Sequence, residues 1–284
     1  MEMTQDAAIS QLKRSIRKLG SSVENYGDPT LMRFLVARSM DPDKAAKMFV
    51  AWQKWRASFV PKGFIAESEV RDELDARKIC LQGLSRDGNP VLIVRASLHY
   101  PAKDQLQFRK FVVHLLDKAL TWYYIMNLSI SLVSKIHFQI LQTAVYCFLF
   151  YMAVLLYYSD AFSPFGGRVI GNEKLIAILD LESLAYKNVD SRGIITGFQL
   201  LQDYYPERLR KFFIVNMPWF FVSVWKMVSY FLDRATLEKV VIVSDEDGRK
   251  SILEEIGEHV LPERYGGHAR LVALQDFTPT PYND

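Results

Sequence analysis

A short segment that is apolar on nearly every side constrains this chain more than any other feature. After the turn at Asn216-Met217-Pro218, residues 219–232 read WFFVSVWKMVSYFL, with Lys226 as their only charge. A surface helix normally has a polar face that recurs about every 3.6 residues, and this stretch hardly has one. It is also too short to cross a bilayer, which takes about 20 apolar residues. The segment is therefore either a central core helix or a wall over a pocket for an apolar ligand.

Strand-like and helix-like segments alternate through most of the remaining chain. Apolar, β-branched runs predict strands at 79–84, 90–96, 175–179, 212–215 and 239–243, and the turn at 86–89 joins the first two as a hairpin. Helices are predicted at 104–120, 189–203, 219–232 and 246–258. This alternation indicates βαβ units, and hence an α/β fold with a largely parallel sheet covered by helices.

The first part of the chain is predicted to be helical. An amphipathic helix is expected over 4–19, and Asp28-Pro29 and Asp41-Pro42 each place a capping residue before a proline of a first helical turn. A charged, mostly exposed helix is expected over 67–78. The predicted organisation is a helical module at 1–78 followed by an α/β domain at 79–284.

Composition and missing motifs exclude several classes of protein. A net charge of +3 is too small to indicate a nucleic-acid partner, but it permits weak attraction to an anionic membrane surface. With two cysteines and no signal peptide, a reducing, cytoplasmic location and a monomer are expected. The chain lacks phosphate-loop, dinucleotide-binding, nucleophile-elbow and metal-ligand motifs, which argues against an enzyme.

An uncharged apolar segment interrupts the α/β pattern at about 121–160. Residues 138–158 alone are long enough for a membrane span. A single crossing would separate strands that have to pair in one sheet, whereas a hairpin would not. Three interpretations stay open: a retained intron or wrongly assigned exon, a membrane-associated helix, and a wall of a ligand cavity.

Several segments together carry a family resemblance. They are the helical stretch LMRFLVARSMDPDKAAKMFVAWQKWR, the D-G-N-P-V hairpin, LIAILDLES, YYPERLRKFFIVNMP with the apolar helix after it, ATLEKVVIV, and LPERYGG at 261–267. In this order and spacing they resemble the CRAL-TRIO lipid-binding family, in its Sec-fourteen-like phosphatidylinositol-transfer branch. The resemblance covers about residues 28–276 apart from 121–165. It implies a mixed, mostly parallel sheet flanked by helices, a helical module before it, and one lipid molecule in an apolar pocket.

The resemblance also implies particular site residues. Residues 219–232 match a mobile gate helix that closes the pocket. The candidate gate and pocket residues are Trp219, Phe220, Phe221, Val224, Trp225, Met227, Val228 and Phe231. The pair Gly266-Gly267 matches a glycine turn near the hinge of the gate, where a positive φ is tolerated.

Three charged residues match the positions that hold the headgroup in phosphoinositide-binding members. They are Arg56, Glu207 and Lys239. Arginine and lysine supply charge-assisted hydrogen bonds to phosphate, and Glu207 can accept from inositol hydroxyls. The alternative is that Arg56 and Glu207 form an ion pair between the helical module and the sheet domain.

The function implied is non-enzymatic binding of a phospholipid, with phosphatidylinositol expected, and its transfer between membranes or presentation to lipid kinases. No cofactor other than the bound lipid is expected. The protein would act as a peripheral membrane protein, and single-pass or hairpin association through 121–158 stays open. Strand 175–179 has no hydroxyl side chains, which phosphatidylcholine-binding members carry there, so a sterol- or tocopherol-type cargo is also open. A membrane-anchored lipid sensor and a lipid-modifying enzyme are the rival functions.

Overall fold

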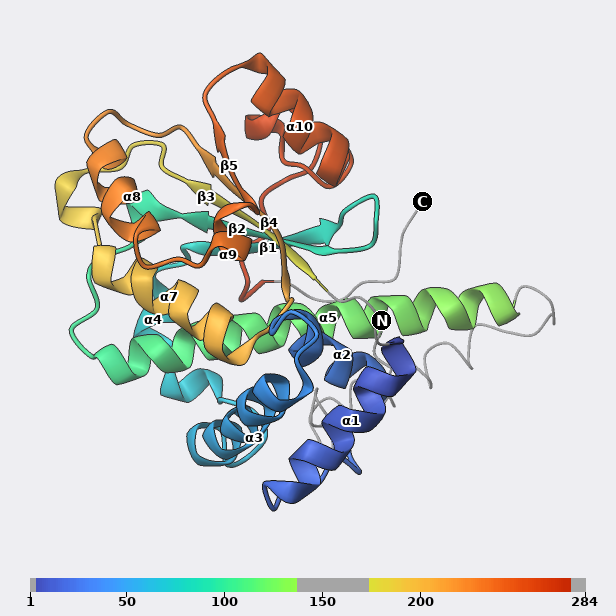
Figure 1. Ribbon diagram of the computed structural model, residues 1–284. Coiled ribbons are helices and arrows are strands. Elements are labelled where there is room, and N and C mark those ends of the chain that lie inside the picture. The colour runs from blue at the N-terminus through green and yellow to red at the C-terminus, as the bar shows by residue number, and fades with distance from the viewer. Residues whose placement is uncertain (1–3, 137–173, 277–284) are drawn as a thin grey trace.

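A five-stranded sheet forms the centre of the molecule, which is described here by a computed structural model for residues 4–136 and 174–276 (Figure 1). Strands β2 to β5 run parallel, and β1 pairs with β2 antiparallel. The strands lie in chain order: β1 (Ile79–Leu84), β2 (Pro90–Arg95), β3 (Leu175–Asp180), β4 (Leu209–Val215) and β5 (Val240–Val243). The predicted mixed, mostly parallel sheet is therefore confirmed.

Helices cover both faces of this sheet. One face packs against α5 (Gln105–Ile136), α7 (Ser191–Tyr204) and α8 (Phe221–Ser229), with the short α9 (Arg234–Leu237) leading into β5. The other face packs against α10 (Glu246–Ile256), as Figure 1 shows. Successive side chains of β3 alternate between these faces, as they must in a strand: Ile176 and Ile178 belong to the cluster that includes α10, and Ala177 faces the other way.

The segment predicted to form a helical module contains α1 (Gln5–Lys18), α2 (Asp28–Val36), α3 (Pro42–Phe59) and α4 (Arg71–Asp75), and the division of the chain at residue 78 stays a prediction. Asp41 caps α3 as predicted, because its carboxylate accepts hydrogen bonds from the amides of Asp43 and Lys44. Asp28 instead lies inside the first turn of α2, which has Gly27 at its cap. The predicted helix at 67–78 is replaced by a 3-10 turn at Glu67–Glu69 followed by the short α4.

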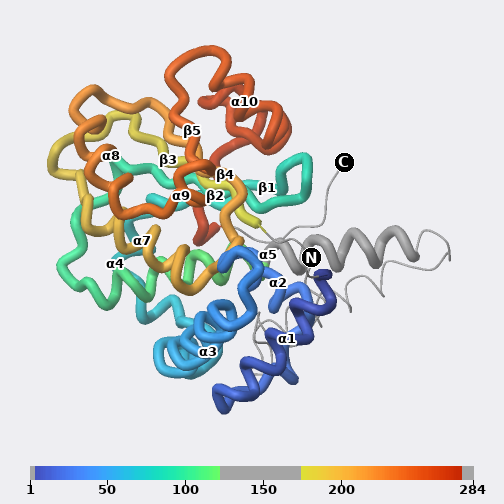
Figure 2. Tube along the Cα trace, in the orientation of Figure 1, coloured from blue at the N-terminus to red at the C-terminus, as the bar shows by residue number. Residues whose placement is uncertain are grey.

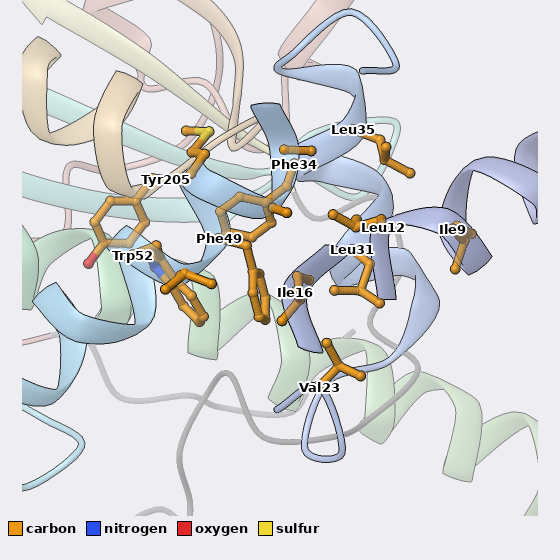
Figure 3. Close-up of a cluster of buried hydrophobic side chains, with 14 of the residues drawn as sticks. Ile9, Leu12, Ile16, Val23, Leu31, Phe34, Leu35, Phe49, Trp52 and Tyr205 are labelled. Atoms are coloured by element: carbon orange, nitrogen blue, oxygen red, sulfur yellow. The ribbon is translucent and has the colours of Figure 1, made fainter. Parts of the chain in front are cut away.

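The module shares its core with the sheet domain. Buried side chains from α1, α2 and α3 form one cluster with Leu116 and Leu120 of α5, Ala177 of β3 and Tyr205. Figure 3 shows the part of this cluster in which Tyr205 lies beside Trp52 and Phe49. Figures 1 and 2 show the module lying alongside α5 and α7. Burial of this shared apolar surface is what fixes the module against the sheet domain.

Besides the helix at 67–78, three predicted elements have boundaries that differ from the structure by three residues or more. Helix α5 does not end at Leu120 but runs on to Ile136, since no proline or glycine interrupts it. Helix α8 is shorter than the predicted 219–232, and β4 begins at Leu209 rather than at 212. Within the described ranges, no helix is both long and apolar enough to cross a membrane. The rest of the predicted apolar segment, 137–160, lies outside the described residues.

Candidate functional site

An apolar cavity lies between the sheet and helices α5, α7 and α8. Its volume is about 180 Å³. The walls come from β2, β3, β4 and all three helices, and they include Leu92, Val94, Leu115, Ala177, Leu179, Phe198, Phe212 and Phe221.

Small residues leave room for this cavity. Between Leu175 and Leu179, strand β3 presents only the methyl group of Ala177 to it. Gly193 and Gly197 of α7 also line it, and a Cβ built on Gly197 meets no heavy atom within 4 Å. The face of α7 that borders the cavity is therefore partly bare backbone.

Helix α8 covers part of the cavity and has an apolar outer side. Phe221 is buried and lines the cavity, and Val228 is buried against α7 and Leu232. Val224 and Trp225 are half-buried in the same region, where Trp225 lies 6.3 Å from the ring of Phe198. Of the predicted gate residues, these four face the protein.

The remaining gate residues face outward or lie in the preceding turn. Trp219 is 81% exposed, and Met227 and Phe231 are also exposed. Next to Phe231, Tyr230 is 86% exposed. Phe220 stacks on Tyr186 with 4.4 Å between ring centroids. An apolar helix with aromatic side chains in solvent is typical of a surface that contacts another apolar phase.

Glu207 and Lys239 meet at one edge of the sheet. Glu207 lies just before β4 and Lys239 just before β5, and the starts of adjacent parallel strands lie together. One Glu207 oxygen lies 3.4 Å from the Lys239 ammonium and 3.5 Å from that of Lys174, which immediately precedes β3. Sequence analysis missed Lys174, although its place before a buried parallel strand was a usable signal. The structure thus gathers two lysines and a glutamate at this edge.

The backbone at Glu207 is unusual. Its φ is +56°, in the left-handed region that residues other than glycine seldom adopt. Such conformations cost about 1–3 kcal/mol and cluster at functional sites. The turn after Pro206 therefore holds Glu207 in a defined position between the two lysines.

Arg56 has different partners. On α3, its guanidinium lies 2.6 Å from the Asp117 carboxylate of α5, 3.1 Å from the Gly63 carbonyl oxygen and 3.4 Å from the Tyr205 hydroxyl. Tyr205 in turn donates to Asp117 at 2.7 Å. Burial alone would lower the pKa of Arg56, but Asp117 and Tyr205 outweigh it and raise that pKa. The structure therefore shows an ion pair between the helical module and the sheet domain, and this pair is formed by Arg56 and Asp117.

Each glycine of the predicted turn is required for a different reason. Gly266 has a φ of +93°, whereas at Gly267 an added Cβ would overlap the Leu261 carbonyl oxygen. The neighbouring Tyr265 hydroxyl donates to Asp180 at the end of β3, at 2.7 Å. Burial raises the pKa of Tyr265 well above its ordinary value. The hinge role of the two glycines stays a prediction.

Asp180 also ties the glycine turn to the segment that leads into α8. Its other oxygen accepts a hydrogen bond of 2.9 Å from the Asn216 amide, and Asn216 has a φ of +56°. Three of the sequence motifs, those around Asp180, Asn216 and Tyr265, therefore meet at the carboxyl ends of β3 and β4.

The structure combines a mixed sheet between helices with an apolar cavity under a partly exposed apolar helix. Comparison with known families identifies the class of protein that has this architecture. The sequence profile of the CRAL/TRIO domain matches residues 74–267, more than half of the chain, so this chain belongs to that family. It is Sec14-like: the Sec14 cytosolic factor of Schizosaccharomyces pombe is 28% identical over 277 residues, which cover 95% of this chain and 84% of the relative.

Two further comparisons agree. The phosphatidylinositol/phosphatidylcholine transfer protein SFH12 of Arabidopsis thaliana is 27% identical over 243 residues, which cover 84% of this chain and 39% of that protein. The crystal structure of Sfh5 superposes with a TM-score of 0.55 at 16% identity, over 90% of this chain and 78% of the other. The latter likeness shows the shared fold.

Proposed function

We propose that this protein binds one phospholipid molecule in the cavity and carries it between membranes or presents it to lipid kinases, with phosphatidylinositol as the ligand. The observation that carries this proposal is an apolar cavity beneath a helix whose outer side is also apolar. Sec14 relatives and a relative named as a phosphatidylinositol/phosphatidylcholine transfer protein support lipid binding and transfer. The protein acts as a cytoplasmic monomer, without catalysis and without a nucleic-acid partner.

The headgroup lies at the edge of the sheet where β3, β4 and β5 begin. Lys239 and Lys174 donate charge-assisted hydrogen bonds to its phosphate, and Glu207 accepts from its hydroxyls. Arg56 contributes by holding Tyr205, two residues before Glu207, against Asp117. The acyl chains extend from this edge along the apolar face of β3.

Helix α8 is the gate in this proposal. In water it stays closed, because opening exposes the apolar surface beneath it at about 25 cal/mol per Å². At a membrane, the exposed side chains around Trp219 and Tyr230 enter the lipid and stabilise the open state. Lys226 on the same helix adds attraction to anionic lipid. Gly266 and Gly267 form the hinge of the gate in this proposal, and the neighbouring Tyr265 is linked through Asp180 to Asn216, which leads into α8.

Filling the cavity tests the proposed function. Gly197→Phe is expected to reduce the lipid that co-purifies with the protein, and the transfer of labelled phosphatidylinositol between vesicles, by more than tenfold. The open space at Gly197 lets the new ring enter the cavity without displacing the backbone. Native mass spectrometry measures the bound lipid, and a vesicle assay measures transfer.

Gly197→Ala is the matched control. It adds only a methyl group, should leave transfer unchanged, and should stabilise α7 slightly because glycine is a poor helix former. Full transfer by a folded Gly197→Phe variant, or no lipid and no transfer in the wild-type protein, would contradict the proposed function.

The exposed aromatic side chains that flank α8 are expected to set membrane binding. Trp219→Ser combined with Tyr230→Ser should lower the fraction of protein that sediments with phosphatidylserine-containing vesicles several-fold, because large amphipathic rings are lost from the contact. The control is Leu19→Ser, which removes an exposed apolar side chain at the end of α1, far from α8 in Figure 1. Equal sedimentation of both variants and wild type would refute this role of α8.

A further inference from the structure

The outer face of the helical module is basic. Residues 1–62 contain 11 lysines and arginines against 6 acidic residues, a net charge of +5, although the whole chain carries only +3. Positive charge is therefore concentrated at this end of the chain. Five of the cations are exposed on the two longest helices of the module: Arg14, Arg17 and Lys18 on α1, and Lys47 and Lys54 on α3.

These five exposed cations have no carboxylate partner within the described part of the chain. The ion pairs that α1 and α3 form there involve Lys13, Lys44 and Arg56 instead. A helix dipole favours cations in the last turn of a helix, but Lys47 and Lys54 lie before the last turn of α3. Stabilisation of the fold therefore does not account for these charges, and they are left to act on a partner.

Hydrogen bonds hold α1 and α3 side by side. The Ser15 hydroxyl of α1 donates to the Asp43 carboxylate in the first turn of α3, at 2.7 Å. Just after α1, the Ser22 carbonyl oxygen accepts a hydrogen bond of 3.0 Å from the Gln53 amide of α3. With 14 and 18 residues, the two helices are about 21 and 27 Å long. The five cations therefore belong to one extended surface, which we call the basic face.

Charge without apolar side chains favours a lipid surface as the partner of the basic face. Protein interfaces are built around buried aromatic and aliphatic side chains. Among the large hydrophobic side chains that the described residues expose, only Leu19 belongs to either helix, as the C-cap of α1. Anionic headgroups need no such contact, because each lysine or arginine near an anionic membrane strengthens binding about fivefold. Clusters of about four to eight such residues are typical of lipid-binding surfaces.

The basic face and the exposed aromatic side chains around α8 point away from each other. Trp55 of α3 stacks on Tyr204 of α7, with 3.9 Å between ring centroids, and Val228 of α8 packs against Phe198 of α7. Figure 1 shows α7 between α8 and α3. Since α3 and α8 both bury the side that faces α7, their outer sides face in different directions. One flat membrane cannot contact both surfaces, whereas two membranes can.

We propose that the basic face is a second membrane-docking surface and that the protein tethers two membranes. The aromatic side chains around α8 enter one membrane, and the basic face contacts the anionic headgroups of the other. The basic contact is the weaker one, because salt screens exposed charges, so binding to a single vesicle still depends on α8. The inference deepens the proposed function and rests on it for the contact of α8 with membranes, but it requires neither a bound lipid nor lipid transfer.

Vesicle clustering, followed by dynamic light scattering, tests the tether. Wild type is expected to cluster vesicles of phosphatidylcholine and phosphatidylserine, but not vesicles of phosphatidylcholine alone. Arg14→Gln combined with Lys47→Gln and Lys54→Gln should slow clustering at least tenfold, because three charges worth about fivefold each are lost from the contact. The fraction of this triple variant that sediments with the same vesicles should stay within about twofold of wild type. In about 1 M salt, where the Debye length is about 3 Å, the clusters should disperse.

The matched control is Arg86→Gln combined with Arg249→Gln and Lys250→Gln. It makes the same change in net charge at exposed cations on or beside α10, on the other face of the sheet. This control should cluster vesicles at the wild-type rate. Exposed substitutions change stability little, and circular dichroism checks that both variants are folded.

The tether is overturned if wild type does not cluster anionic vesicles, if the triple variant clusters them at the wild-type rate, or if the control slows clustering equally. It is also overturned if the triple variant no longer sediments, because the basic face would then be the main membrane contact. No clustering, with polyglutamate binding to wild type but not to the triple variant, would assign the basic face to an acidic protein segment instead. Clustering without phosphatidylinositol transfer by wild type would refute the proposed function and leave the tether standing, and transfer without clustering would refute the tether alone.

Discussion

Replacing Asp117 with alanine is expected to lower the free energy of unfolding by about 3–5 kcal/mol, since breaking a buried ion pair leaves an uncompensated charge. The side chains of Asp117 and Arg56 are only 10% and 12% exposed, and the Tyr205 hydroxyl donates to the same carboxylate. The pair connects α3 of the helical module to α5, so its loss affects the contact between module and sheet domain. Equilibrium unfolding in urea, followed by circular dichroism, measures the change.

Two controls make this result specific. Glu238→Ala breaks the Arg234–Glu238 pair, whose side chains are 92% and 63% exposed, and should cost less than about 1 kcal/mol. Arg56→Met combined with Asp117→Leu replaces the buried pair with apolar groups and should recover most of the lost stability. A loss in Asp117→Ala no larger than that in Glu238→Ala would contradict the structural role of the pair.

The same double variant decides how Arg56 acts. If Arg56 acts by positioning Tyr205, the folded Arg56→Met/Asp117→Leu protein transfers phosphatidylinositol more slowly than wild type, because Tyr205 loses its contacts with both replaced side chains. Transfer at the wild-type rate would instead show that the Arg56–Asp117 pair only joins the helical module to the sheet domain.

The fold was largely predictable because its determinants are local. Strands and helices differ in the spacing at which their apolar residues recur along the chain. This spacing located every strand of the described sheet. Boundaries were less predictable. Helix α5 continues beyond Leu120 because no helix-breaking residue follows. The change from charged to uncharged residues at that point does not by itself end a helix.

The candidate site was predictable only where neighbouring strands bring residues together. Glu207 and Lys239 meet because each begins one of two adjacent parallel strands, and the same reasoning could have found Lys174. The partner of Arg56 was not predictable, because Asp117 lies on a helix whose register against α3 is set by packing.

Lys78 shows where such reasoning fails. It was predicted to end an exposed, charged helix over 67–78, and the structure buries it beside β1 instead. Its partners Glu73, His99 and Asp190 come from three separate segments, which only the folded chain brings into contact. In the sequence, a lysine and a glutamate five residues apart resemble the exposed charges of a surface helix, although here both side chains are buried.

Lys239→Ala combined with Glu207→Ala is expected to reduce phosphatidylinositol transfer between vesicles by about 100-fold or more. Each removed side chain contributes hydrogen bonds involving a charged group, about 1.5–3 kcal/mol each, to a headgroup that must leave water to bind. Stability should change little, because the two groups are partly exposed and are removed together. Labelled phosphatidylinositol in donor vesicles measures transfer, and circular dichroism checks the fold.

The control for this variant is Asp247→Ala combined with Lys250→Ala. It removes one carboxylate and one ammonium from an exposed pair on α10, on the other face of the sheet, and so makes the same change in charge. This control should transfer phosphatidylinositol like wild type. Undiminished phosphatidylinositol transfer would show that the headgroup does not lie between these strands.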